Sequence, residues 1–294
     1  MNSFKERAFK YVFCVLAYCS LLFLLGIVLT LVFNSLQAIL NINQLQFFFS
    51  DDWAPYFYPP IFGTLQLVIS SFMVGAMACL IAVPIAVCTA LFLFELASPR
   101  ARAFLKPFIE ILAGLPSIIF GFFAMVVIAP WLQRTFDLPS GLGAFTAAFT
   151  LAFLAIPQIV SITEDALSFV PKSFKEASFA LGANRWQTLS KVIIPAAGSG
   201  ISTAIILGAS RVIGETMVVV MVAGGATALP ESIFSPVRPM TATIASEMGE
   251  AAHGSLHFSA LFEIGLMLFV ITLILNLLAT RISKKFRLKL GHGR

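Results

Sequence analysis

Apolar residues are concentrated in six long runs, and polar segments separate each run from the next. A helix that crosses a bilayer needs about 20 apolar residues, and every run reaches that length. Backbone groups in lipid must be hydrogen-bonded within the chain, so such runs form helices. The pattern predicts an all-α, polytopic membrane protein with six transmembrane helices, over Tyr11–Phe33, Leu65–Phe94, Phe108–Trp131, Leu142–Ile162, Ala196–Ala223 and Ser259–Thr280.

The composition excludes a soluble protein. Of the 294 residues, 59% are hydrophobic and only 11% are charged, whereas about a quarter of a soluble domain is charged. The four cysteines lie inside apolar runs without metal-ligand spacing, so we expect neither disulfides nor a metal site. The first run is too long for a cleavable signal. We therefore expect a multi-pass protein of the bacterial plasma (inner) membrane.

The cations are distributed asymmetrically among the loops. All but three of the 19 Lys and Arg residues fall in the N-terminal tail, the second loop, the fourth loop or the C-terminal tail. Cytoplasmic loops carry such an excess, so this pattern predicts that both termini are cytoplasmic. The net charge of +5 is then a consequence of topology, and a nucleic-acid partner is not expected.

The longest of these cationic loops runs over about 35 residues, from Ser161 to Pro195. Ser173 is placed to cap a helix, with Glu176 completing a capping box. Gly182 should break that helix, and a second helix should start at Ala183-Asn184. Pro195 should end the segment. The pattern predicts a helix–glycine–helix element lying along the membrane face.

The spacing within this element resembles the EAA loop of ABC importer permeases. Glu176, Ala177, Gly182 and Pro195 match the E-A-A, three residues, G, nine residues, I-x-L-P pattern, while Ser178, Val192 and Ile194 depart from it mildly. The resemblance implies that the element, including Trp186, docks into a groove on an ATPase subunit. The chain has no GxxxxGK[ST] phosphate loop. We therefore expect no enzymatic activity and no bound cofactor in this chain, with ATP held by a separate ATPase.

Four ionisable residues fall inside the predicted helices. Such groups cost roughly 2.5–3.5 kcal/mol each on insertion scales and are functional candidates. Glu110 and Glu263 lie near helix ends, where they are expected to reach water. Arg211 and Glu215 are placed at or beyond the membrane midplane, four residues apart and within pairing reach.

The Arg211/Glu215 pair suggests an oxyanion pathway. The planar guanidinium suits a tetrahedral oxyanion, and a nearby carboxylate accepts a hydrogen bond from a protonated anion. The pair could therefore favour hydrogen phosphate over sulfate. A structural pair that joins two helices is the alternative.

Three further segments, residues 211–225, 111–123 and 241–277, resemble phosphate ABC permeases of the PstC type. The first reads RVIGETMVVVMVAGG and the second ILAGLPSIIFGFF, in which we expect Pro116 to interrupt the helix and the Ser117 hydroxyl to face the substrate pathway. The resemblance implies a type I ABC permease fold and import of inorganic phosphate by alternating access.

The same resemblance implies the division of the chain and its partners. Residues 1–60 would hold the N-terminal tail, first transmembrane helix and external loop, residues 61–282 the permease domain, and residues 283–294 a basic cytoplasmic tail. The expected partners are a homologous permease of the PstA type, two ATPase subunits, an extracytoplasmic phosphate-binding protein and the lipid bilayer.

Three alternatives remain open from the sequence. A permease of the same family could carry sulfate or molybdate. A secondary transporter would need no docking loop and usually shows internal repeats, and a membrane enzyme would need a catalytic constellation that the sequence lacks. His253 and His257, with Glu250 nearby, have helical spacing for a metal, but Gly249 and Gly254 weaken a helix there.

Overall fold

The computed structural model describes residues 3–291, with side chains described for residues 9–281. Apart from one two-stranded hairpin, the regular structure is helical. The elements are α1 Ser3–Asn41, α2 Gln44–Phe49, β1 Trp53–Ala54, β2 Ile61–Phe62, α3 Leu65–Leu91, η1 Phe92–Leu96, α4 Pro99–Ala113, α5 Ser117–Phe123, η2 Ala124–Ile128, α6 Ala129–Thr135, α7 Ala144–Ser168, α8 Lys172–Ala180, α9 Arg185–Thr188, η3 Leu189–Ile193, α10 Ile194–Ile213, α11 Met217–Val222, α12 Met240–Glu247 and α13 Leu256–Gly291.

Within the described residues, six helical segments are long and apolar enough to cross a membrane, as the sequence predicts. They span Phe9–Asn41, Leu65–Leu96, Ser117–Thr135, Ala144–Ser168, Arg185–Ile213 and Leu256–Arg281. The predicted basic tail, residues 283–294, lies outside the residues whose side chains are described.

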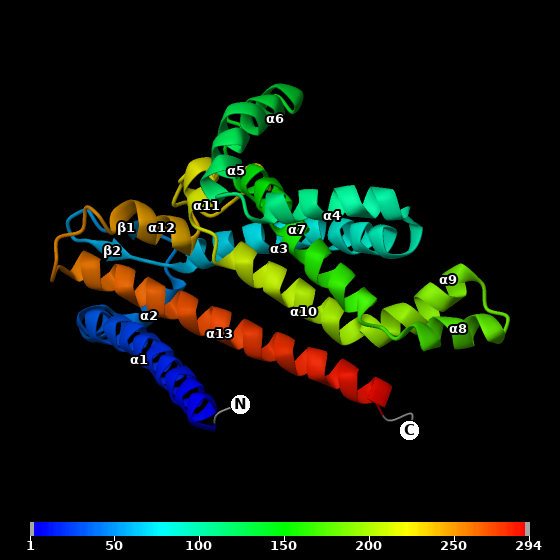
Figure 1. The fold of residues 1–294 in the computed structure, drawn as a ribbon. Helices are drawn as coiled ribbons and strands as arrows, with labels where there is room; N and C mark the ends of the chain where they lie inside the picture. The colour runs from blue at the N-terminus through cyan, green and yellow to red at the C-terminus, as the bar shows by residue number, and fades with distance from the viewer. Residues whose placement is uncertain (1–2, 292–294) are drawn as a thin grey trace.

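The third predicted helix is two helices rather than one. α4 ends at Ala113 with Gly114 as its cap, and α5 begins at Ser117 after Pro116, whose backbone is extended. Proline has no N–H to continue the ladder, and it disfavours a helical conformation in the residue before it. In Figure 1, α5 and α6 turn away from the line of α4. The start at Phe108 was therefore wrong, although the interruption at Pro116 is confirmed.

The fifth predicted helix also has different ends. It begins at Arg185 and stops at Ile213, where Gly214 is the cap, and residues 217–222 form the separate helix α11. Pro195 does not end the element before it, because the π turn η3 lies just before Pro195 and continues without a break into α10. The fourth loop is correspondingly shorter than the sequence suggests, since α7 continues to Ser168.

Small residues bring three helices together at the centre of the fold. Ala78, Ala82, Ala86 and Ala90 form one fully buried stripe along α3, and α3 packs along α7, which carries its own row of buried alanines. α10 packs against α7 at Gly200 and Gly208, where an added Cβ would overlap Ala166 and Ile159. Close backbone approach of this kind is how membrane helices associate, because lipid offers no hydrophobic gain for burying larger side chains.

A second apolar cluster lies at one end of the molecule. It joins Phe47, Trp53, Phe62, Met240 and Leu261, from α2, the hairpin, α12 and α13. Figure 1 shows the hairpin and α12 at this end, with α8 and α9 at the other. α1 packs on α13, and its apolar side chains from Phe9 to Leu29 are mostly exposed, as expected of a lipid-facing helix.

We predict that Gly208→Leu weakens the packing of α10 on α7. The new side chain would overlap Ile159, and overpacking of this kind costs about 1–3 kcal/mol. Thermal unfolding of the purified protein in detergent is the measurement. Gly198→Leu is the matched control, since Gly198 is on the same helix with no atom within 4 Å of the added Cβ. Equal melting temperatures for the two variants would contradict the packing role.

Candidate functional site

The segment resembling a docking loop folds as two short helices joined by a tight turn. α8 and α9 meet at Gly182, whose φ of +81° is a conformation that favours glycine. The hydroxyls of Ser178 and Thr188 lie 2.9 Å apart and are both buried, which holds the two helices together. The predicted helix–glycine–helix element is confirmed as a local structure.

The capping of this element differs from the prediction. Pro171, not Ser173, precedes α8, and it makes no side-chain cap, so Glu176 completes no capping box. A capping box is instead present at α9. Asn184 Oδ1 accepts from the Gln187 N–H at 2.8 Å, and Gln187 Oε1 accepts from the Asn184 N–H at 2.9 Å. Glycine at 182 therefore ends one helix and Asn184 starts the next.

The outer surface of the element presents large apolar groups to solvent. Leu181 is 90% exposed and Trp186 is 69% exposed, with Phe179 beside them at 40%. Glu176 and Ala177 are exposed on α8. Several large apolar side chains on an otherwise polar element mark a contact surface for another protein.

Ion pairs connect the helices that lie next to this element. Lys175 Nζ of α8 lies 2.7 Å from a carboxylate oxygen of the largely buried Glu95, in η1. The fully buried Glu164 of α7 pairs with both Arg102 and Lys106 of α4, the latter at 2.6 Å. The sequence reasoning missed these pairs, because nothing local links residues that lie about 60 to 80 positions apart.

Arg211 and Glu215 do not form the predicted pair. Arg211 lies in the last turn of α10, and Glu215 lies beyond its end, so they do not share a helix face. Arg211 Nη1 instead faces Oε1 of Gln158 on α7, at 3.5 Å. Glu215 Oε1 accepts from the Met217 N–H at 3.2 Å, at the start of α11, because the helix breaks at Gly214.

The other predicted residues are spread along the chain. Ser117 is half-buried at the first position of α5, and Glu110 is exposed on α4, as expected. Glu263 is only 4% exposed, and its Oε2 has no hydrogen-bond partner among the described residues. Its predicted position at a water-accessible end is therefore wrong, because α1 and α2 cover this part of α13.

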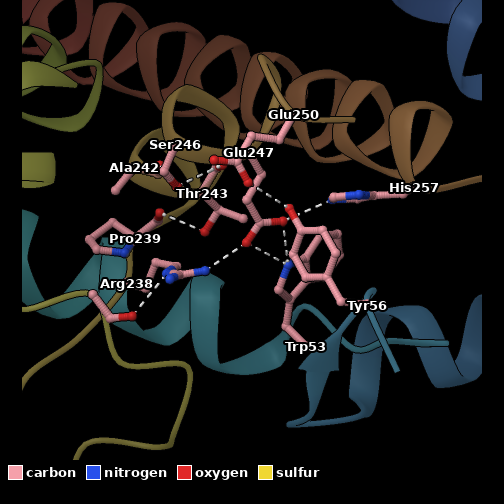
Figure 2. Close-up of polar contacts among 11 residues, drawn as sticks. Trp53, Tyr56, Arg238, Pro239, Ala242, Thr243, Ser246, Glu247, Glu250 and His257 are labelled. Atoms are coloured by element: carbon pink, nitrogen blue, oxygen red, sulfur yellow. Dashed lines mark hydrogen bonds and ion pairs between the residues drawn. The ribbon is translucent and has the colours of Figure 1, made fainter. Parts of the chain in front are cut away.

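A buried carboxylate organises the opposite end of the molecule (Figure 2). Glu247, at the end of α12, is 5% exposed. Its carboxylate accepts from Arg238 Nη1 at 2.6 Å and from Trp53 Nε1 at 3.0 Å, and it lies 2.9 Å from His257 Nε2. One side chain thus connects the hairpin, the segment before α12 and the start of α13.

The surroundings of Glu247 also account for the two histidines. His257 bonds to Glu247, while His253 packs on Phe258. Among the residues that the structure describes, no group of three His, Cys, Asp or Glu side chains is arranged to hold a metal.

Partial burial, together with the negative charges of Glu247 and Glu250, raises the pKa of Tyr56 above its ordinary value.

Comparison with known proteins identifies the family of this chain. Residues 82–288 match the family described as "Binding-protein-dependent transport system inner membrane component". The chain belongs to this family. It is a multi-pass inner-membrane permease, and its six apolar helices agree with that assignment.

Relatives of this permease cover nearly its whole length. It is 34% identical over 276 residues to the "Probable ABC transporter permease protein YqgH" of Bacillus subtilis, covering 92% of this chain and 89% of that protein. It is 36% identical to the "Phosphate transport system permease protein PstC" of Mesorhizobium japonicum, covering 86% and 82%. The protein of the same name from Haemophilus influenzae is 33% identical, covering 96% and 94%.

Solved structures share the fold of the permease. A chain of a bacterial ABC transporter for alginate import superposes with a TM-score of 0.65 at 11% identity, covering 96% of this chain and 98% of that one. A chain of the MetNI methionine ABC transporter superposes with a TM-score of 0.56 at 21% identity, covering 76% and 94%. The fold is therefore that of a type I ABC permease.

We predict that Lys175→Glu and Glu95→Lys each loosen the α8–α9 element. Breaking a buried ion pair costs about 3–5 kcal/mol, and the low end applies because Lys175 is partly open to water. Protease sensitivity of the 169–184 segment should rise in each single variant and return toward wild type in the double charge exchange. Additive damage in the double variant would show that the pair does not hold the element.

We also predict that Glu247→Ala strongly destabilises the end of the molecule that carries the hairpin and α12. It leaves the Arg238 and Trp53 donors without their acceptor, at a cost of about 3–5 kcal/mol. Glu250→Ala is the control, since Glu250 is exposed and makes only a 3.5 Å contact with Tyr56. Thermal unfolding in detergent should give a lower melting temperature for Glu247→Ala than for Glu250→Ala. Similar losses of stability in both variants would show that Glu247 is not the hub, the side chain that joins the hairpin, the segment before α12 and the start of α13.

Proposed function

We propose that this permease is the membrane-spanning subunit of an ATP-driven importer that carries inorganic phosphate into the cytoplasm. The observation that carries the substrate is the set of relatives named phosphate transport system permease, which match this chain over most of its length at 33–36% identity. The methionine and alginate transporters support the fold only, because their identities are far lower.

The proposed anion contact is Arg211. It lies in the last turn of α10, two residues before the apolar segment ends at Ile213, and no carboxylate lies within ion-pair distance among the described residues. A membrane-embedded cation without a counter-charge is costly, and a transported oxyanion would supply that charge. The guanidinium fork matches phosphate oxygens. Glu215 and Ser117 remain predicted pathway residues, at the breaks that flank α11 and α5.

The proposed partner on the inner side is an ATPase subunit that receives α8 and α9. The exposed Leu181 and Trp186, with Glu176, Ala177 and the Gly182 turn, form a compact handle on the membrane body. With this handle in the cytoplasm, both termini are cytoplasmic, as the distribution of Lys and Arg predicts. ATP is bound and hydrolysed on the ATPase, two copies of which would serve the complex.

The proposed partners on and above the membrane complete the importer. A homologous permease of the PstA type would pair with this chain, and an extracytoplasmic phosphate-binding protein would deliver substrate to the end that carries the hairpin and α12. The chain itself performs no bond chemistry.

The ion pairs at the inner ends suggest how ATPase movement reaches the pathway. Lys175 connects α8 to the end of the α3–η1 segment, while Glu164 connects α7 to α4. A pull on α8 is therefore passed to the helix bundle that holds Arg211. Because packed helices have discrete arrangements, such a pull would switch the pathway between outward and inward openings.

The test is ATP-dependent uptake of labelled phosphate by proteoliposomes that contain the complete complex. Wild-type uptake should resist excess sulfate, and Arg211→Gln should reduce uptake at least tenfold with assembly intact. Competition by sulfate would move the substrate to another oxyanion. Undiminished uptake by the variant would make Arg211 a structural residue.

A further inference from the structure

Arg211 has a polar neighbour on α7. Gln158 lies near the middle of the 25-residue helix α7, directly after Pro157. Its Oε1 accepts from Arg211 Nη1 at 3.5 Å, and both side chains are half-buried rather than sealed. A neutral amide in the middle of a long apolar helix is a signal that the sequence itself contains.

The contact leaves most of the polar capacity of both groups unused. Within the described residues, it is the one side-chain hydrogen bond that either Gln158 or Arg211 makes, and Arg211 forms no ion pair. The 3.5 Å separation lies at the limit of a hydrogen bond, so the two groups are adjacent without being locked together. The amide N–H donors of Gln158 and the remaining guanidinium donors are free to bind an oxygen ligand.

The charge balance favours an anion at this place. A glutamate at 158 would neutralise Arg211, whereas glutamine keeps the positive charge uncompensated and adds further donors. Hydrogen bonds to a charged group are about twice as strong as those between neutral groups. An oxyanion between the two side chains would receive charge-assisted bonds from Arg211 and direct donors from Gln158.

The position of the pair also fits a pathway. On α7, Ile162 and Ala166 follow Gln158 by about one and two helical turns. On α10, Thr203 precedes Arg211 by about two turns. These three residues line a cavity of about 460 Å³ between the inner ends of α7 and α10. Asp165 also lines this cavity, but its carboxylate is paired with Lys106 at 2.7 Å. The Gln158–Arg211 pair thus lies on the helix faces that continue into this inner cavity.

We propose that Gln158 is a specificity-determining residue that binds the transported oxyanion together with Arg211. The proposal rests on the proposed function for the direction and class of substrate. Gln158 Oε1 orients the Arg211 guanidinium, and the amide N–H groups of Gln158 donate to an oxygen of the anion. Gln158 takes the position at the side of Arg211 that the sequence had assigned to Glu215.

The test measures phosphate uptake by the complete complex in proteoliposomes for Gln158→Leu and Gln158→Glu. The leucine variant should raise the KM for phosphate about tenfold or more with little change in maximal rate, because it removes donors to a charged ligand. The glutamate variant should abolish uptake by pairing with Arg211, while the complex still assembles. If Gln158→Leu fails to assemble, Gln158→Asn, which withdraws the amide by one methylene, should show the raised KM.

The matched control is Asn276→Leu. Asn276 on α13 is also an amide within a membrane helix that contacts α10, since its Oδ1 accepts from Ser210 Oγ at 2.6 Å. It is expected to leave the KM for phosphate unchanged. Wild-type KM values in assembled Gln158→Leu and Gln158→Glu complexes, or an equal effect of Asn276→Leu, would overturn the proposal.

Transport by the wild-type complex distinguishes a failure of the proposed function from a failure of the role proposed for Gln158. If it carries a different oxyanion, phosphate is the wrong substrate, and the same variants measured with that oxyanion decide the role of Gln158. If it carries a solute without negative charge, both the proposed function and the binding role of Gln158 are overturned.

Discussion

α7 packs closely against α3, α4 and α10. α3 and α10 approach it through alanine and glycine, and α4 is tied to it by Glu164. Because these backbones lie so close, the polar side chains of α7 have fixed positions relative to the other helices. Gln158 faces Arg211, and Asp165 faces Lys106, as a result of this packing.

Much of the fold follows from the sequence because its signals are local. Six apolar runs predict six helices, and the glycine at 182 predicts the turn between α8 and α9, since these depend on hydropathy and backbone freedom. Helix ends were less predictable. Gly214 reads as a packing residue in an apolar run, whereas in the structure it ends α10 and removes Glu215 from the face of Arg211.

Contacts between distant segments account for the remaining differences. No local pattern indicates that Glu247 binds Trp53, 194 residues earlier, or that Lys175 pairs with Glu95. Gln158 was predictable in part, because a neutral amide in the middle of an apolar helix is unusual. Its partner could not be read from the sequence, since it depends on how α7 and α10 are aligned.

Prolines shape several helices without ending them. In η2 and η3, the residue directly before a proline, Ala129 or Ile194, bonds to the carbonyl five positions back. The wider π turn moves the backbone away from the proline ring and spares the helix a break. At Pro116 no such turn forms, and the chain divides into α4 and α5.

The hub at Glu247 has a mechanical consequence. Sliding the hairpin past α12 or α13 would strip several hydrogen bonds from one buried charge at the same moment, so these segments must travel together as a rigid cap. Relative displacement is then left to the backbone breaks at Gly114–Pro116 and Gly214–Thr216, where the described residues form no ion pair and where one hydrogen bond, from Thr241 Oγ1 to the Glu215 carbonyl at 3.0 Å, joins the second break to α12. Both breaks adjoin the short helices α5 and α11, which pack on each other. The permease is thus a stiff frame with two hinges that meet at one place.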